Sequence, residues 1–253
     1  MSEVEYAVVG RVATIALNRP KRMNALDGAM REAIESHLHE AEADPAVRVV
    51  AITGRGRAFC AGADLQALRD KPDEVSAHLA QAKKTILAMR GSPKPIVARI
   101  NGPAIGAGMN LALACDMRVA SNRATLGQPY LKVGLHPDWG GTYWLPRMIG
   151  DAQARRLLLT GEIVTAAEAL DLGLLHQVVP EAKLDAAMMV LAIQLGSVSP
   201  EATAAAKRSM FEAEREALER ALDVEAAAQA ERVRSPQAAE GIAAFLERRA
   251  PKF

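Results

Sequence analysis

The chain has 253 residues, enough for one large α/β domain or a core with a smaller appendage. Its 31 Lys and Arg nearly balance its 30 Asp and Glu, and aromatic residues are few, so neither nucleic acid nor an anionic membrane is favoured as partner. Cys60 and Cys115 have no paired spacing, the first residues lack the apolar region of a signal peptide, and no apolar run could span a bilayer. We therefore expect a cytoplasmic protein with reduced thiols.

The first expected elements along the chain are a hairpin and a capped helix. Residues 6–9 and 12–17 are apolar runs on either side of Gly10-Arg11, a pattern typical of two paired strands. Asp27 precedes apolar residues that recur every four positions, which predicts a helix with Asp27 as its N-cap. We expect Asp44-Pro45 to end this helix.

Two further strands are each followed by a loop of small residues. The runs 47–53 and 96–100 are apolar and rich in Val and Ile, as expected of buried strands. The loops that follow are residues 59–65, with the sequence FCAGADL, and residues 101–108, with the sequence NGPAIGAG. The second loop leads into an expected buried helix over residues 109–115.

The remaining chain is mostly helical. Residues 117–120 are expected to form a strand, and from about residue 151 the helical pattern is broken only at 177–180. The last stretch, residues 197–253, shows amphipathic helices without a flexible linker, so we expect it to be packed on something rather than flexible. We divide the chain into a core, residues 1–196, and a helical C-terminal segment, residues 197–253.

The two glycine loops point to a particular chemistry. Each leaves backbone N–H groups at the positive end of a helix, and two such loops could supply both donors of an oxyanion hole. Alternatively, glycine simply permits tight turns there. Nucleotide binding does not fit, because no Gly-Lys-Ser/Thr run occurs and residues 54–56 lack the third glycine of a dinucleotide fingerprint. The scattered histidines predict no metal site.

Six motifs occur in order along nearly the whole chain: Asn18-Arg19-Pro20 with Asn24-Ala25-Leu26, residues 58–65, residues 100–108, Gly140-Gly141-Thr142 with Leu145-Pro146-Arg147, Leu159-Thr160-Gly161, and Ala169 with Gly173-Leu174. Together they resemble the enoyl-CoA hydratase/isomerase (crotonase) superfamily, and the site pattern is most similar to the isomerases that use an aspartate. The resemblance implies an α/β fold, a crotonase-like spiral of ββα units with a helical C-terminal trimerisation segment. It also implies an acyl-CoA substrate, no metal, no cofactor beyond the CoA moiety, and a homotrimer or dimer of trimers.

The resemblance assigns binding residues as well. It places the oxyanion hole on the backbone N–H groups of Ala63 and Ala107, which would stabilise the enolate-like thioester oxygen. The CoA contacts that it implies are Arg22, Ala25, Ala61, Asp64, Leu65, Gln66, Gly106, Phe245 and Arg248. From the residues alone, Asp64 is better explained as a helix N-cap, and Arg248 can equally be a solvated charge.

The catalytic carboxylates differ from the hydratase pattern. The resemblance leads us to expect two glutamates, but Asn110 and Tyr130 stand at those positions, and neither is a base at its ordinary pKa. Asp138 remains, in the segment where family isomerases carry an aspartate, although it can also be a turn residue after Pro137. One carboxylate suffices to remove a proton and return it two carbons away. This favours a double-bond shift with Asp138 as acid/base.

Two other functions stay open beside the isomerase. One is a hydratase, or a hydrolytic or dehalogenating relative, with Asp138 as base or nucleophile. The other is a non-catalytic acyl-CoA-binding protein. Asn110, Tyr130 and Trp139 are candidates for the acyl pocket, where aromatic rings would suit a cyclic or unsaturated acyl group.

Overall fold

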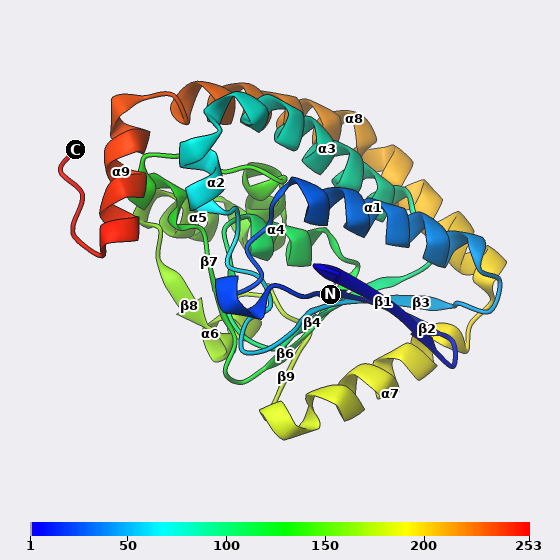
Figure 1. Ribbon diagram of the computed structural model, residues 1–253. Helices are drawn as coiled ribbons and strands as arrows, with labels where there is room; N and C mark the ends of the chain where they lie inside the picture. The colour runs from blue at the N-terminus through cyan, green and yellow to red at the C-terminus, as the bar shows by residue number, and fades with distance from the viewer. Residues whose placement is uncertain (1) are drawn as a thin grey trace.

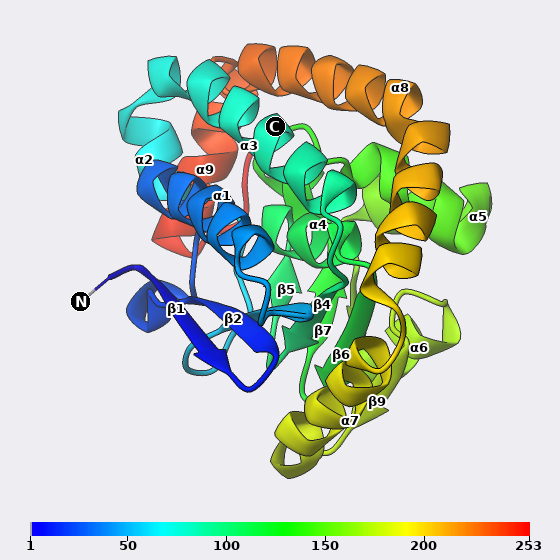
Figure 2. The same ribbon diagram turned by 90° about the vertical axis from the view of Figure 1, so that its right-hand side faces the viewer.

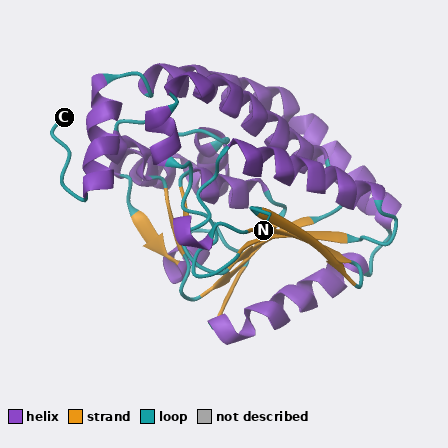
Figure 3. Cartoon of the chain, in the orientation of Figure 1, coloured by secondary structure: helices purple, strands orange, loops and turns teal. Residues whose placement is uncertain are grey.

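The computed structural model describes residues 2–253, in which strands lie between layers of helices (Figure 1, Figure 3). The strands are β1 (Val4–Val9), β2 (Val12–Leu17), β3 (Val49–Gly54), β4 (Ile96–Ile100), β5 (Ala104–Ile105), β6 (Met117–Ser121), β7 (Thr125–Gly127), β8 (Ile163–Thr165) and β9 (Gln177–Val179). The helices are α1 (Gly28–Ala43), α2 (Leu65–Asp70), α3 (Val75–Gly91), α4 (Ala107–Ala114), α5 (Gly141–Thr160), α6 (Ala166–Asp171), α7 (Leu184–Gly196), α8 (Pro200–Arg232) and α9 (Pro236–Glu247). Short segments of 3-10 helix are η1 (Pro20–Arg22), η2 (Pro72–Glu74), η3 (Pro129–Val133) and η4 (Glu181–Lys183).

The strands of residues 2–253 form two sheets. The larger sheet has the order β1-β2-β3-β4-β6-β9; β1 and β2 are antiparallel, and the other pairs are parallel. The smaller sheet has the order β5-β7-β8. All of β3 and most of β4 are buried, which explains why their sequences are continuous apolar runs rather than alternating ones.

The structure confirms the expected hairpin and the capped first helix. Val9 pairs with Val12 across the turn between β1 and β2. The side chain of Asp27 accepts a hydrogen bond from the N–H of Met30 at 3.0 Å, which satisfies one of the free donors at the start of α1. The strand after α1 begins at residue 49 instead of 47, because the N–H of Val47 donates to the carbonyl of Asp44 in the intervening turn.

Helices cover both faces of the larger sheet. Figure 1 shows α1, α3 and α8 on one side of this sheet and α7 on the other. Met30 and Ile34 of α1 belong to the main core, while Met188 of α7 packs with Val49 and Val97 in a separate cluster. The sheet is therefore buried from both sides, as parallel strands require.

The C-terminal segment packs on the core as expected. Figure 2 shows α8 running beside α3, and Arg90 of α3 forms an ion pair with Glu214 of α8 at 2.7 Å. The last helix of the segment, α9, lies close to η3. A Cβ on Gly241 of α9 would stand 2.5 Å from the main chain of Val133 in η3. No single helix in the described residues is long and apolar enough to cross a membrane; one bent pair, Glu181–Gly196 with Pro200–Arg232, passes that test by length and composition alone.

Candidate active site

The two glycine loops lie side by side. The N–H of Ile105 donates to the carbonyl of Cys60 at 2.9 Å, and Cys60 forms an isolated parallel bridge with Ala104. Gly62 has a φ of +96°, and a Cβ there would lie 2.8 Å from the carbonyl oxygen of Ile105. Glycine is needed at this position both for its backbone angle and for the close approach of the second loop.

Ala63 and Ala107 carry two backbone N–H groups that donate to no acceptor within residues 2–253. Ala107 is the first residue of α4, so its N–H has no carbonyl partner inside the helix. The bridge to Leu26 uses the carbonyl of Gly62 and the N–H of Asp64, which leaves the N–H of Ala63 unused. These two groups are the donors expected from the sequence, and a helix N-terminus adds positive potential at one of them.

Asp64 is engaged locally. Its side chain accepts hydrogen bonds from the N–H groups of Gln66 and Ala67 at the start of α2, and it forms an ion pair with Arg19 at 3.1 Å. The carboxylate thus caps the helix, which is the local explanation that the residues themselves favour.

A largely apolar cavity of about 470 Å³ opens beside the two N–H groups. Both glycine loops, η3 and α9 contribute to its wall. The lining includes Ala63, Ala107, Leu65, Tyr130 and Phe245. A pocket of this size, with few polar groups and two free N–H donors, suits an extended acyl thioester.

The predicted CoA contacts divide into two groups. Ala61, Leu65, Gly106 and Phe245 line the cavity, whereas Arg22, Ala25, Asp64, Gln66 and Arg248 do not. Arg248 ends α9 in a left-handed conformation with a φ of +57°. Its neighbour Arg249 lines the cavity and forms an ion pair with Glu240 at 2.6 Å.

Asp138 is buried behind the cavity wall, and both of its carboxylate oxygens accept hydrogen bonds. The hydroxyl of Tyr130 donates to Oδ1, and Nε2 of Gln229 on α8 donates to Oδ2 at 3.2 Å. Tyr130 and Gln229 line the cavity, but Asp138 does not. The structure therefore brings the predicted Asp138 and Tyr130 into direct contact, with the tyrosine on the cavity side.

Asn110 holds the main chain of Asp138, whereas Tyr130 and Gln229 contact its side chain. It is fully buried on α4 and lies outside the cavity lining. Its Nδ2 donates to the main-chain carbonyl of Asp138 at 2.6 Å, and its Oδ1 accepts from Nε2 of Gln128. The amide thus fixes the backbone that carries the carboxylate.

Asp138 begins a tight turn over residues 138–142, the Asp138 loop. Trp139 is buried and has a φ of +55°, a left-handed conformation that is uncommon for a large residue. Its carbonyl accepts from Nε1 of Trp144 at 3.1 Å. Glu225 of α8 accepts from the N–H groups of Gly140 at 2.7 Å and Thr142 at 2.8 Å. The strained turn is thereby fastened to the C-terminal helix.

Burial shifts the ionisation of this cluster. It raises the pKa of the Asp138 carboxyl, although hydrogen bonds from Tyr130 and Gln229 and the positive charge of Arg31 oppose that change. Burial and the neighbouring Asp138 raise the pKa of the Tyr130 hydroxyl well above its ordinary value. Burial also raises the pKa of the Glu225 carboxyl to about 7. The hydroxyl of Tyr130 therefore stays protonated and donates a hydrogen bond to the carboxylate of Asp138.

Three residues of the site, Gln229, Glu225 and Arg31, lie outside the motifs of the sequence. Glu225 and Gln229 are separated by three alanines, so they share one helix face, and this spacing was the available signal. Arg31 of α1 is 4% exposed and donates to the carbonyl of Leu26 at 3.3 Å. Its Nε and Nη1 are buried without a partner in the described part of the chain. The position of Arg31 in a helix far along the sequence from Asp138 does not indicate that its charge acts on that carboxyl.

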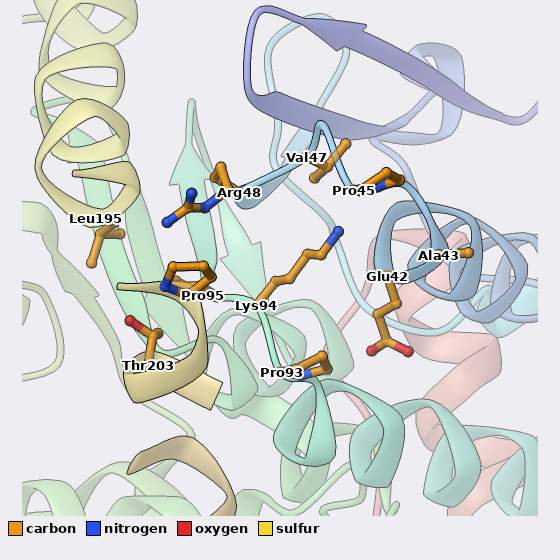
Figure 4. Close-up of a pocket in the computed structure, with 11 residues that line it drawn as sticks. Glu42, Ala43, Pro45, Val47, Arg48, Pro93, Lys94, Pro95, Leu195 and Thr203 are labelled. Atoms are coloured by element: carbon orange, nitrogen blue, oxygen red, sulfur yellow. The ribbon is translucent and has the colours of Figure 1, made fainter. Parts of the chain in front are cut away.

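A second cavity, of about 290 Å³, is lined by residues from the end of α1, the segment before β4 and the connection between α7 and α8, and includes Lys94 and Arg48 (Figure 4). Lys94 Nζ donates to the carbonyls of Ala41 and Asp44, and Arg48 Nη2 donates to the carbonyl of Val198 at 2.7 Å. Both cations are thus engaged by the main chain.

Across residues 2–253 no three His, Cys, Asp or Glu side chains are grouped so as to hold a metal ion.

Comparison with known proteins gives consistent matches. A family model described as enoyl-CoA hydratase/isomerase matches residues 8–253. A Rhodobacter capsulatus protein named "Probable enoyl-CoA hydratase" is 37% identical over 99% of this chain and 97% of its own length. The Escherichia coli 1,2-epoxyphenylacetyl-CoA isomerase is 34% identical over 100% of this chain and 97% of its own length. A crystal structure of an enoyl-CoA hydratase from Mycobacterium avium subsp. paratuberculosis superposes with a TM-score of 0.91 at 31% identity, covering 100% of this chain and 98% of that one.

Proposed function

The chain belongs to the enoyl-CoA hydratase/isomerase family, and we propose that within it the protein shifts a double bond in an enoyl-CoA with Asp138 as acid/base. The family membership and the α/β fold expected from the sequence motifs are thereby confirmed. The observation that carries the proposal is the hydrogen bond between the carboxylate of Asp138 and the hydroxyl of Tyr130. Tyr130 lines the same cavity as Ala63 and Ala107, whose backbone N–H groups are free.

The proposed reaction needs one proton to move. In a β,γ-enoyl-CoA the C–H bond at the α carbon breaks, and its electron pair spreads onto the thioester oxygen. The N–H groups of Ala63 and Ala107 stabilise the negative charge there. The proton then returns to the γ carbon, and the double bond ends in the α,β position. The reaction needs no metal or redox cofactor, and we propose that the CoA moiety of the substrate is the only cofactor-like group.

Water addition requires more than this site offers. The usual route uses two carboxylates to orient and deprotonate one water. Asn110 is an amide that holds the main chain of Asp138, and Tyr130, whose raised pKa keeps it un-ionised at rest, does not supply a second carboxylate. The other nearby carboxylate, Glu225, is bound to the N–H groups of the Asp138 loop. These contacts support the isomerase over the hydratase.

A hydratase is the second candidate, because it is the activity that most of the related proteins are named for. The isomerase is also represented, in the name of the Escherichia coli relative with 34% identity. Relatives with the same overall fold can therefore differ in reaction, and the site residues must decide.

Incubation with two substrates separates these functions. Purified protein is mixed with crotonyl-CoA and, separately, with trans-3-hexenoyl-CoA, and the products are separated by chromatography. The isomerase converts trans-3-hexenoyl-CoA into its α,β isomer and leaves crotonyl-CoA unhydrated. Formation of 3-hydroxybutyryl-CoA as the main activity would show a hydratase, and tight binding of both esters without product would show a non-catalytic binder.

A further inference from the structure

We propose that Tyr130 is the residue that touches the reacting carbon, and that it relays the proton between the substrate and Asp138. The inference rests on the proposed function, because it assigns the atom through which that proton passes. It gives Tyr130 a catalytic role in place of the pocket-lining role that the sequence indicates.

The position of Tyr130 supports this role. Tyr130 lines the cavity together with Ala63 and Ala107. A Cβ built on Gly106 would lie 3.4 Å from Cζ and 3.6 Å from the hydroxyl oxygen of Tyr130. Gly106 directly precedes Ala107, so the end of the Tyr130 ring packs against the residue that adjoins one of the two N–H groups that would hold the thioester oxygen. The relay requires that a carbon next to that thioester carbonyl lie within reach of this hydroxyl.

Asp138 is less well placed to act directly. It lies outside the cavity lining, and its two oxygens are bound to Tyr130 and Gln229. Gln229 itself is fixed, because its Oε1 accepts from the N–H of His136 at 2.9 Å. For Asp138 to reach the substrate, the hydroxyl of Tyr130 would have to leave a buried hydrogen bond to a carboxylate, which is among the stronger kinds.

The relay balances as a double proton transfer. When the α C–H bond breaks, its proton passes to the oxygen of Tyr130 while the phenolic proton passes to Oδ1 of Asp138. The electron pair stays on the substrate as the dienolate. In the second half Tyr130 gives a proton to the γ carbon and takes one back from Asp138. Because the two transfers are coupled, no free phenolate forms in this buried place.

The test measures proton abstraction separately from isomerisation. Butyryl-CoA, which has no double bond to move, is incubated in D₂O, and deuterium at its α carbon is followed by mass spectrometry. Tyr130→Phe is expected to lower the exchange rate about 100-fold or more, to the level of Asp138→Asn, as befits a general acid–base group. The double variant is expected to be no slower than either single variant, because the two residues act as one unit.

Tyr143→Phe is the matched control. Its hydroxyl donates to Glu214 at 3.3 Å and Tyr143 does not line the cavity, so this variant also loses a hydrogen-bonded tyrosine hydroxyl and should exchange normally. Butyryl-CoA affinity, measured by calorimetry, verifies that Tyr130→Phe is folded. If that variant does not fold, 3-fluorotyrosine at position 130 preserves shape and hydrogen bonding but makes the phenol more acidic, and the exchange rate and its pH profile should change.

The outcomes separate the two proposals. Exchange in Tyr130→Phe within a few-fold of the wild type, or no effect of fluorination, overturns the relay and leaves Asp138 as the direct base. Wild-type exchange without isomerisation of trans-3-hexenoyl-CoA overturns the proposed function but leaves the relay intact. If the wild type shows no exchange at all, the relay is overturned.

Discussion

Asn110 donates a 2.6 Å hydrogen bond from its side-chain amide to the main-chain carbonyl of Asp138. A carboxylate at position 110 could not make this bond, because it offers only acceptors to a carbonyl oxygen. The departure from the hydratase pattern therefore has a structural consequence. An amide at this position anchors the segment that carries the remaining acid.

Asn110→Asp should damage the position of Asp138 and also alters a 3.4 Å contact with the hydroxyl of Tyr130, while Asn110 itself does not line the cavity. The substitution keeps the size of the side chain but places an unpaired acceptor against the carbonyl, a loss of about 1–3 kcal/mol of unfolding free energy. We expect kcat to fall and acyl-CoA affinity to change little, which separates positioning from binding. Denaturant unfolding and steady-state kinetics measure the two effects. A variant with wild-type kcat would show that this bond does not position Asp138.

Ala107→Pro removes one donor of the oxyanion hole. Proline is tolerated at the first position of a helix, and the preceding Gly106 has no Cβ to clash with the ring. We expect kcat to drop about 10²–10³-fold and substrate binding to weaken much less, because the charge develops mainly in the transition state. Ala107→Gly keeps the N–H and is the control. Full turnover by a folded Ala107→Pro protein would contradict the assignment.

Glu225 should make the fold less stable as the pH rises toward neutrality. Its pKa rises from 4.5 to about 7 on folding, so the folded state prefers the protonated carboxyl. The associated stability is fully present below pH 4.5 and is lost as the pH rises through 7, by up to about 3 kcal/mol. Urea unfolding of the wild type and Glu225→Gln across this range tests the expectation. The difference between the two proteins should depend on pH, and parallel curves would refute it.

The sequence predicted those parts of the fold that depend on neighbouring residues. The β1–β2 hairpin, the cap at Asp27 and the strand Ile96–Ile100 follow from local signals that need no distant partner. The smaller sheet was not predicted, because its strands have two or three residues each. Such strands are too short to show an alternating pattern, and their pairing depends on chain segments far apart.

The residues of the candidate site also divide into those that local motifs indicate and those that depend on long-range packing. The motifs gave the loops that hold Ala63, Ala107 and Asp138. They could not give the bond from Gln229 to Asp138, because 91 residues separate the two in the chain. Nor could they show that Tyr130 stands on the cavity side of Asp138, since this depends on how η3 packs against the second glycine loop.

We predict that the protein assembles as a trimer or a dimer of trimers. The family resemblance implies it, and the structure leaves large apolar side chains exposed on α7 and the connection to α8: Ile193 is 66% exposed, Val190 58% and Val198 52%. Light scattering in solution measures the mass directly. Ile193→Glu should weaken assembly if this face takes part, and a stable, active wild-type monomer is the result that would end the prediction.

Asp138→Asn should remove the proton acceptor without changing the shape of the site. We expect turnover of trans-3-hexenoyl-CoA to fall about 10²–10⁴-fold, the usual share of general acid–base catalysis, and CoA-ester affinity to change little. The reaction needs the ionised carboxylate, whose pKa burial raises above 3.8. The wild-type rate should therefore decline on acidification at a higher pH than an ordinary aspartate would give, and the residual activity of Asp138→Asn should lack that acid limb. Normal isomerisation by Asp138→Asn, with the same pH profile as the wild type, would show that another group accepts the proton.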